Sequence, residues 1–363
     1  MAAQSDNSTR SLSQLIAKQA IANALATHSR GIDRADYTLL SSAYHPGASV
    51  DYGFFVGPAS DLAAILAQAQ KTQPVTLHRT SNMWIQVDGA RARSESYVHA
   101  YLESPDPAGS IQRFIGGRYL DTHEERAGEW RLTHRTYVMD WNTNRPSTGI
   151  SFDPPLGLVN FTPRGGHGCA DPGNTMLAAG IAQFNRLGER MANKISDVQI
   201  DAALSKQALH ELGMGYARAA DRADAQLMAS LFHEDSTVVA GIANGSGPAF
   251  AVGVTDHIAK NLQRSFHSVA NEWFHIDGDN AVGESYVIAM VTTGGNDSMT
   301  GGRYADSYER RNGVWKFKSR TFVMDWFTSH PTSHATDGMY GALKTQGRFG
   351  KEDPVYAFWN ARV

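Results

Sequence analysis

The sequence predicts an α+β protein built from two tandem copies of one unit. Residues 116–141 and 301–326 match without a gap at 15 of 26 positions, an order of identity that composition bias does not produce. In each copy, segments with helical periodicity precede alternating, strand-like segments. A chain of 363 residues, 42% of them hydrophobic, also suits about two domains of roughly 150 residues each.

The match continues upstream in the same order. The stretch from Gln19 aligns with the one from Gln207, and the stretch from Leu77 aligns with the one from Phe266. Each copy ends in an irregular tail that contains Asp-Pro. We therefore expect three parts: a first domain over residues 11–175, a linker over 176–198 and a second domain over 199–363.

Helices open each unit. Apolar residues recur at helical spacing over residues 12–30 and 200–220, and shorter helices fit residues 36–44 and 59–70. The linker carries an apolar stripe at the same spacing, which favours a packed helix over a flexible tether. That stripe consists of Leu177, Ile181, Phe184, Leu187, Met191 and Ile195.

Alternating runs follow the helices, and tight turns divide them. Asp-Gly at 88–89 and 277–278 and Asn-Gly at 312–313 supply the positive φ angles that tight hairpins need. The second half of each unit is therefore predicted to be an antiparallel meander. The Gly-rich stretch 241–253 lacks the strand and lysine context of a phosphate-binding loop, so we interpret it as a loop at a pocket entrance.

Composition excludes several classes of partner and cofactor. A net charge of −3 with scattered Lys and Arg attracts neither nucleic acid nor an anionic membrane. The N-terminus lacks a signal-peptide pattern and no apolar run approaches about 18 residues, so we expect a soluble, cytoplasmic protein. With one cysteine, Cys169, no His-Glu-x-x-His motif and no dinucleotide fingerprint, the sequence predicts neither a metal nor another cofactor.

Three motifs, each present in both copies, carry a family resemblance. RGIDRADYTLLSSAYHPGASVDYG, HRTSNMW and GGRYLDTHEERAGEWRLTHRTYVMDW resemble the SnoaL-like branch of the NTF2-like superfamily, relatives of scytalone dehydratase, hexachlorocyclohexane dehydrochlorinase and bile-acid dehydratase. The resemblance implies cone-shaped α+β barrels, each a curved antiparallel sheet wrapped by helices around a deep pocket. It also implies that the two units pack as an internal pseudo-dimer with an approximate two-fold axis, and it leaves open a homo-oligomer.

The resemblance further implies a catalytic histidine and aspartate. The matching residues are His78 with Asp33 in the first copy and His267 with Asp221 in the second. A neutral imidazole can accept a proton near its ordinary pKa of about 6.5, and a carboxylate can hold it in the right tautomer. The alternatives are a hydrogen-bonded core histidine and a helix-end carboxylate, but the recurrence of both residues favours catalysis.

The first copy has more polar groups around this pair than the second. On one face of the run 94–101 the second copy replaces His99 and Tyr101 by Ile288 and Met290. Val239-Ala240 likewise replaces Asp51-Tyr52. We therefore predict that the N-terminal site is the working one, and that Asp221, His267 and Tyr286 are second-site candidates.

Within the N-terminal site, Tyr52 and Tyr97 are predicted to join His78 and Asp33 as catalytic residues, because a phenol can donate a hydrogen bond to a leaving group. Cross-strand packing is the alternative for these tyrosines. For one further candidate, Arg118, an ion pair with Asp121 is the alternative. The residues expected to bind substrate are Tyr44, Asp51, Trp84, His99, Tyr101 and Arg118.

These features together predict a cofactor-independent lyase. The His-Asp pair would remove a proton from a bulky aromatic, polycyclic or other cyclic substrate, and water, halide or formaldehyde would leave, in the catabolism of aromatic compounds. An isomerase resembling ketosteroid isomerase would use the same base. A non-catalytic ligand-binding or assembly protein is the alternative from another class.

Overall fold

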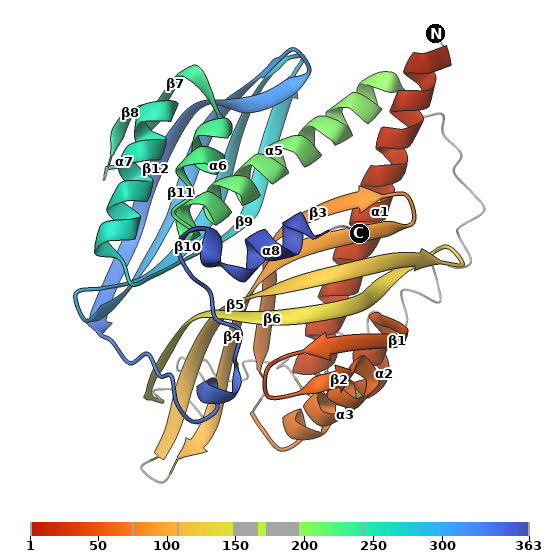
Figure 1. Ribbon diagram of the computed structural model, residues 1–363, viewed down its shortest axis with the longest axis vertical. Helices are drawn as coiled ribbons and strands as arrows, with labels where there is room; N and C mark the ends of the chain where they lie inside the picture. The colour runs from red at the N-terminus through yellow and green to blue at the C-terminus, as the bar shows by residue number, and fades with distance from the viewer. Residues whose placement is uncertain are drawn as a thin grey trace, which may run out of the picture.

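The computed structural model describes residues 2–74, 76–106, 109–147, 166–171, 196–241 and 243–361. They form two domains, each with a six-stranded mixed sheet and three helices ahead of its long strands (Figure 1). The α+β class and the tandem arrangement are therefore confirmed. All but the last three residues of the predicted linker helix over 176–198 lie outside the described residues.

Domain 1 has its helices first and its long strands last, as the periodicity predicts. Hairpin turns at Gly89 and Gly128 have φ of +59° and +80°. The elements are α1 (Ala2–Asp33), α2 (Tyr37–Ser42), β1 (Tyr44–Asp51), β2 (Val56–Pro58), α3 (Ala59–Gln70), β3 (Leu77–Asp88), β4 (Arg91–Asp106), β5 (Gly109–Arg126) and β6 (Glu129–Pro146).

Domain 2 repeats this order and adds a C-terminal extension. Its elements are α5 (Asp197–Asp221), α6 (Ala225–Ser230), β7 (Phe232–Val239), β8 (Asn244–Ser246), α7 (Gly247–Asn261), β9 (Arg264–Asp277), β10 (Asn280–Thr293), β11 (Asn296–Arg311) and β12 (Val314–Pro331). The extension contains two short 3-10 turns and α8 (Pro354–Asn360).

The two sheets have the same topology. Their strand orders are β2-β1-β6-β5-β4-β3 and β8-β7-β12-β11-β10-β9. β1 pairs in parallel with β6, and β7 pairs in parallel with β12, while the other pairs are antiparallel. In both described sheets the last-named strand, β3 or β9, is an open edge, so the expected cone-shaped domains are curved sheets that do not close into a barrel.

One predicted loop is half helix. Residues 247–253, in the Gly-rich stretch, form the first half of α7. Ser246 caps this helix by accepting a hydrogen bond from the Ala249 amide, and Pro248 lies in its first turn, where a missing N–H costs nothing. The glycines around Ser246 and Pro248 led us to interpret this helix start as part of a loop.

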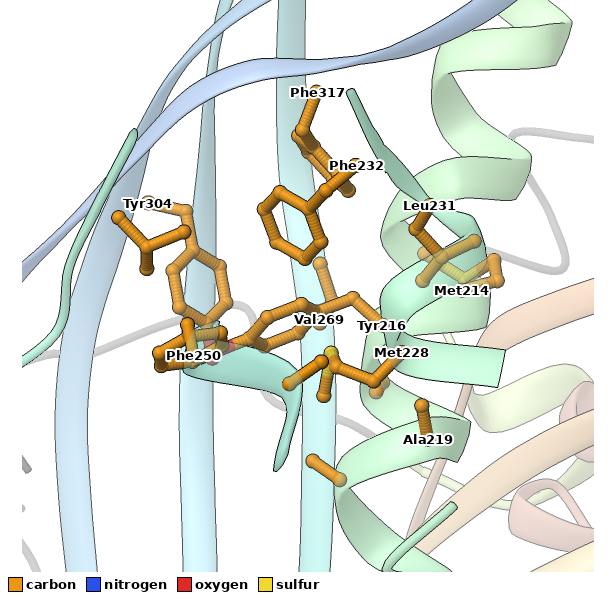
Figure 2. Packing of buried hydrophobic residues seen from close by; sticks show 14 of the residues in the cluster. Met214, Tyr216, Ala219, Met228, Leu231, Phe232, Phe250, Val269, Tyr304 and Phe317 are labelled. Atoms are coloured by element: carbon orange, nitrogen blue, oxygen red, sulfur yellow. The ribbon is translucent and has the colours of Figure 1, made fainter. Parts of the chain in front are cut away.

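The core of domain 2 is rich in aromatic rings. Tyr216 of α5 packs against Phe232, Phe250 and Tyr304, with ring centroids 5.3 to 6.4 Å apart. Figure 2 shows these side chains gathered between α5 and the sheet. They form the inner wall on which the candidate site described below is built.

Helix α5 of domain 2 packs against the sheet of domain 1. Arg218 forms an ion pair with Glu95, and its guanidinium lies 4.0 Å from the centre of the Trp84 ring. Asn82 caps the open edge of β9: its Nδ2 donates to the His267 carbonyl at 2.6 Å and its Oδ1 accepts from the Val269 amide at 2.8 Å. The edge strand that carries His267 is thus covered by domain 1.

These contacts are not reciprocal. In domain 2 the counterpart of Trp84, Trp273, is 61% exposed, and the counterpart of Glu95, Glu284, pairs with Arg303 of its own sheet. The domains therefore pack as an internal pair, but through different surfaces. The approximate two-fold axis that we expected is wrong, because the C-terminal extension covers the sheet face of domain 1.

A buried ion cluster fastens that extension. The guanidinium of Arg118 donates to Asp140 at 2.8 Å and to Asp353 at 2.7 Å, and Arg222, the C-cap residue that follows α5, contacts the same two carboxylates. Burial raises the pKa of Asp353, but the charges of Arg118 and Arg222 outweigh it and hold this pKa well below its usual range. The cluster joins both domains and the C-terminal extension.

Replacing Arg118 by Met should lower the free energy of unfolding by about 3–5 kcal/mol in urea denaturation, because two buried carboxylates lose one of their two cations and keep only Arg222. Arg303→Met changes the equivalent residue in domain 2, whose ion pairs are exposed, and should have a far smaller effect. Equal effects of the two substitutions would contradict this account of the cluster.

Candidate active site

In domain 1 the Asp-His pair joins a helix end to a strand edge. Asp33 is the last residue of α1, and His78 lies near the start of β3. Asp33 Oδ1 accepts from His78 Nδ1 at 2.7 Å and from Thr76 Oγ1 at 2.8 Å, while Oδ2 accepts from the His78 amide at 2.8 Å. The residues that the sequence paired are therefore in contact.

Domain 2 repeats this geometry closely. Asp221 Oδ1 accepts from His267 Nδ1 at 2.6 Å and from Ser265 Oγ at 2.8 Å, and Oδ2 accepts from the His267 amide at 2.9 Å. Asp221 is fully buried. The hydroxyl donor two residues before each histidine was missed by the sequence comparison, because Thr76 and Ser265 differ between the copies.

This arrangement suits a histidine for proton transfer. With Nδ1 held by the carboxylate, Nε2 of His267 has no hydrogen-bond partner in the part of the chain that the structure describes. Burial raises the pKa of Asp221, but His267 and Arg222 outweigh burial and lower it, so the carboxylate stays ionised. An ionised partner stabilises the imidazolium that forms when Nε2 accepts a proton.

His267 lines a cavity of about 530 Å³ in domain 2. Its polar lining groups are His257, His267, Thr300 and the tyrosines 216 and 304, and no Asp, Glu, Lys or Arg is among the residues that line it. The remaining lining residues are Ala220, Ala240, Gly241, Phe250, Val254, Ile258, Leu262, Ala289, Val291, Phe322, Met324 and Phe327. The cavity suits an uncharged, largely apolar ligand.

A buried arginine supports the inner wall of this cavity. Arg320 pairs with Asp306 at 2.8 and 2.9 Å, and its guanidinium lies 4.1 Å from the ring centres of both Tyr216 and Tyr304. Burial raises the pKa of both phenols, and for Tyr216 the arginine partly opposes this. Both phenols therefore remain protonated and can donate hydrogen bonds.

The same region of domain 1 is filled by polar aromatic side chains. His28, the counterpart of Tyr216, is fully buried, with its ring nitrogens 3.2 Å from Tyr44 Oη and 3.3 Å from Tyr52 Oη. Burial and the charge of Arg135 lower the pKa of His28 well below its usual value, so it is neutral. Tyr52 also stacks on Tyr137. Two predicted site residues, Tyr44 and Tyr52, thus meet here.

Three other predicted residues have local partners. Asp51 accepts a hydrogen bond from the Gly53 amide at 2.9 Å, and Tyr101 donates to Glu103. His99 packs against Phe114, and burial together with the charge of Arg79 lowers its pKa to about 4. Nothing in these contacts links them to His78.

The remaining predicted residues lie on the outer sheet face. In domain 1, Trp84, Tyr97 and Arg118 contact domain 2 or the C-terminal extension; the Tyr97 ring lies 5.0 Å from that of Phe266. Tyr286, the counterpart of Tyr97 in domain 2, is 46% exposed and is not among the residues that line the cavity. Arg118 forms ion pairs, as the alternative proposed, but with Asp140 and Asp353, whereas Asp121 pairs with Arg135.

Sequence reasoning missed the arginine beneath each pocket. Arg135 pairs with Asp121 at 2.7 Å, as Arg320 pairs with Asp306. Both arginines stand in the repeated stretch that ends in Val-Met-Asp-Trp, so their identity in the two copies was an available signal. What the sequence could not show is that they lie under the pocket tyrosines.

Each domain is thus an α+β unit in which helices pack on a curved sheet and an Asp-His pair lies at the edge of that sheet. This is the architecture of NTF2-like proteins. A family model for the SnoaL-like domain matches residues 13–136 and 201–321. Because these matches cover more than half of the sequence, the chain belongs to the SnoaL-like domain family, with two copies of the domain.

Characterised relatives match over the length of one domain. The γ-hexachlorocyclohexane dehydrochlorinase of Sphingobium indicum is 26% identical over 137 residues, which are 36% of this chain and 86% of that protein. Hexachlorocyclohexane dehydrochlorinase 1 of the same species is 24% identical over 134 residues, 36% of this chain and 87% of that protein. A crystallised type-3 dehydrochlorinase from Novosphingobium barchaimii is 24% identical, covers 39% of this chain and all of its own, and has a TM-score of 0.36.

The described residues contain neither a membrane-spanning helix nor a metal-binding cluster. None of the helices is long and apolar enough to cross a membrane. Within the same residues, no three His, Cys, Asp or Glu side chains are grouped so that they could hold a metal ion.

The lowered pKa of Asp221 makes a pH-dependent prediction. A carboxyl with a lowered folded-state pKa stabilises the fold above its unfolded pKa of about 3.9, and this contribution is lost as the pH falls through the folded pKa. Asp221→Asn should therefore be less stable than wild type near pH 7, and the gap should narrow between about pH 5 and pH 3 in urea denaturation. A gap that stays constant or widens on acidification would sink the idea.

Proposed function

We propose that the chain is a cofactor-independent lyase whose working pocket is the cavity of domain 2. His267 is the base, Asp221 orients it, and the substrate is an uncharged cyclic or aromatic compound. The observation that carries this proposal is the Asp-His pair at the wall of an apolar cavity. An apolar surrounding strengthens each electrostatic interaction with the reacting atoms.

In this reaction His267 Nε2 takes a proton from a carbon of the substrate. The electrons of that C–H bond form a double bond to the neighbouring carbon, and the group on that carbon leaves with its bonding electrons. Tyr216 and Tyr304 are the phenols of the cavity and donate hydrogen bonds to the departing group.

Halide fits this step directly, and the relatives named as dehydrochlorinases support it. Water leaves by the same step when the departing hydroxide also takes a proton from one of the phenols. Formaldehyde requires a different step, in which His267 takes the proton of a hydroxymethyl O–H, the C–O bond becomes C=O, and the electrons of the broken C–C bond pass to the substrate carbon, which is then protonated by the imidazolium.

The pair in domain 1 has the same hydrogen bonds, and its catalytic role stays a prediction. The sequence favoured it because of its polar surroundings. In the structure Tyr44 and Tyr52 are hydrogen-bonded to His28, so these phenols are engaged within the protein. We therefore propose domain 2 as the site of the reaction.

Replacing His267 by Ala should lower turnover by about 10²–10⁴-fold, the usual contribution of a positioned base. His78→Ala is the matched control and should leave most of the turnover in place. Activity is followed by mass spectrometry on a panel of uncharged cyclic and aromatic compounds that carry a leaving group, beginning with γ-hexachlorocyclohexane. Unchanged turnover in His267→Ala would contradict the proposal, and loss confined to His78→Ala would move the site to domain 1.

The mass of the product separates the two enzyme classes. A lyase releases a fragment, so the product is lighter than the substrate, whereas an isomerase returns the proton and leaves the mass unchanged. If the wild-type protein binds a compound of the panel to saturation and forms no product from it, the result would favour the ligand-binding alternative.

A further inference from the structure

The C-terminal extension crosses domain 1 after leaving β12. Figure 1 shows it, in dark blue, running from domain 2 along domain 1 before it returns to α8. It is bound to β6 along its length: Asn142 exchanges two hydrogen bonds of 2.9 Å with the backbone of Ala335, and Met139 exchanges bonds of 3.0 and 2.8 Å with Thr345 and Gly347. This strap, residues 332–347, belongs to domain 2 in sequence and to domain 1 in contacts.

The strap inserts two side chains into domain 1. Tyr340 and Leu343 are only 2% and 8% exposed, and the Tyr340 hydroxyl donates to Asn144 Oδ1 at 2.6 Å. Both side chains belong to an apolar cluster on the inner part of the sheet. The sheet residues of that cluster are Ala100, Leu102, Ile115, Tyr137 and Met139.

All five of these residues have counterparts in the cavity wall of domain 2. The strand register supports the equivalence: Ile115 lies between Ala100 and Asn142 as Thr300 lies between Ala289 and Phe327. The five counterparts are Ala289, Val291, Thr300, Phe322 and Met324, and every one lines the open cavity. Tyr340 and Leu343 therefore occupy in domain 1 the space that is empty in domain 2.

We propose that domain 1 holds a second ligand pocket, and that the strap is its built-in occupant. The phenol ring of Tyr340 and the aliphatic side chain of Leu343 take the place of an uncharged aromatic ligand. A ligand of that chemistry competes with the strap for domain 1, whereas no described segment of the chain fills the cavity of domain 2. The chain thus has one open site and one closed site of the same ancestry.

The seating of the strap is close enough to exclude a ligand while it is in place. A Cβ atom added at Gly53, whose φ is +75°, would lie 2.5 Å from the carbonyl oxygen of Ala342 and from the amide nitrogen of Lys344. Only glycine allows the loop after β1 to approach the strap so closely. The strap is also fixed at its start, where Asp297 accepts from the Ser333 amide at 3.0 Å.

Because both ends of the strap are anchored, the two inserted side chains can be truncated without cutting the chain. The double substitution Tyr340→Ala and Leu343→Ala empties the pocket of domain 1 and leaves the Asp297 and Asp353 anchors intact. Met339→Ala is the matched control, since Met339 lies in the same strap but is 49% exposed. Asn142→Ala, which removes the two bonds to Ala335, is a milder second variant.

The test is the number of equivalents of Nile red, an uncharged aromatic dye, bound at saturation in a fluorescence titration of the full chain. We expect the double variant to bind one equivalent more than wild type and Met339→Ala to match wild type. Exchange of the Met139 and Asn144 amides, which donate to Thr345 O and Ser333 Oγ of the strap, should also become at least about tenfold faster in the double variant and in Asn142→Ala.

An unchanged number of equivalents in a double variant that still melts cooperatively contradicts the proposal. So does an extra equivalent that appears equally in Met339→Ala. If the double variant fails to fold, Asn142→Ala decides by the same titration, with faster exchange and tighter dye binding expected. None of these readouts requires turnover, so the result is independent of whether His267 is a catalytic base.

Discussion

One carboxylate in each domain fixes both the fold and the candidate chemistry. Asp221 ends α5 and accepts three hydrogen bonds from β9, one from the backbone and two from side chains. The same bonds that attach the first helix to the edge of the sheet therefore set the tautomer and the direction of the imidazole. Substitution of this residue must therefore disturb both the attachment of the helix to the sheet and the orientation of the imidazole, in either domain.

The two copies kept this carboxylate and diverged in what fills the space beside it. In domain 2, Ala240 replaces Tyr52 and Phe322 replaces Tyr137, and the loss of one ring and two hydroxyls leaves an apolar cavity. In domain 1 the tyrosines remain bonded around His28, and the strap covers what is left. The two domains thus share one fold but have different pockets.

Much of this could be predicted from the sequence because it is local or repeated. The helix-then-strand order and the hairpin turns follow from period and turn chemistry. The Asp33–His78 and Asp221–His267 pairs were expected from the family resemblance, which recurs in both copies. The closure of the domain 1 pocket could not be predicted, since it depends on Tyr340 reaching Asn144 across 196 positions of sequence. The non-reciprocal packing of the domains likewise depends on long-range contacts, and the matching Trp84 and Trp273 gave no sign that only one would be covered.

The most direct test of this account is a crystal structure of the chain with an uncharged aromatic ligand at a concentration that saturates one site. The account predicts ligand density beside His267, among the residues that line the cavity of domain 2, with Tyr340 still seated against Ile115 and Met139 in domain 1. Ligand density beside His78, with the strap displaced and the cavity of domain 2 empty, would contradict it.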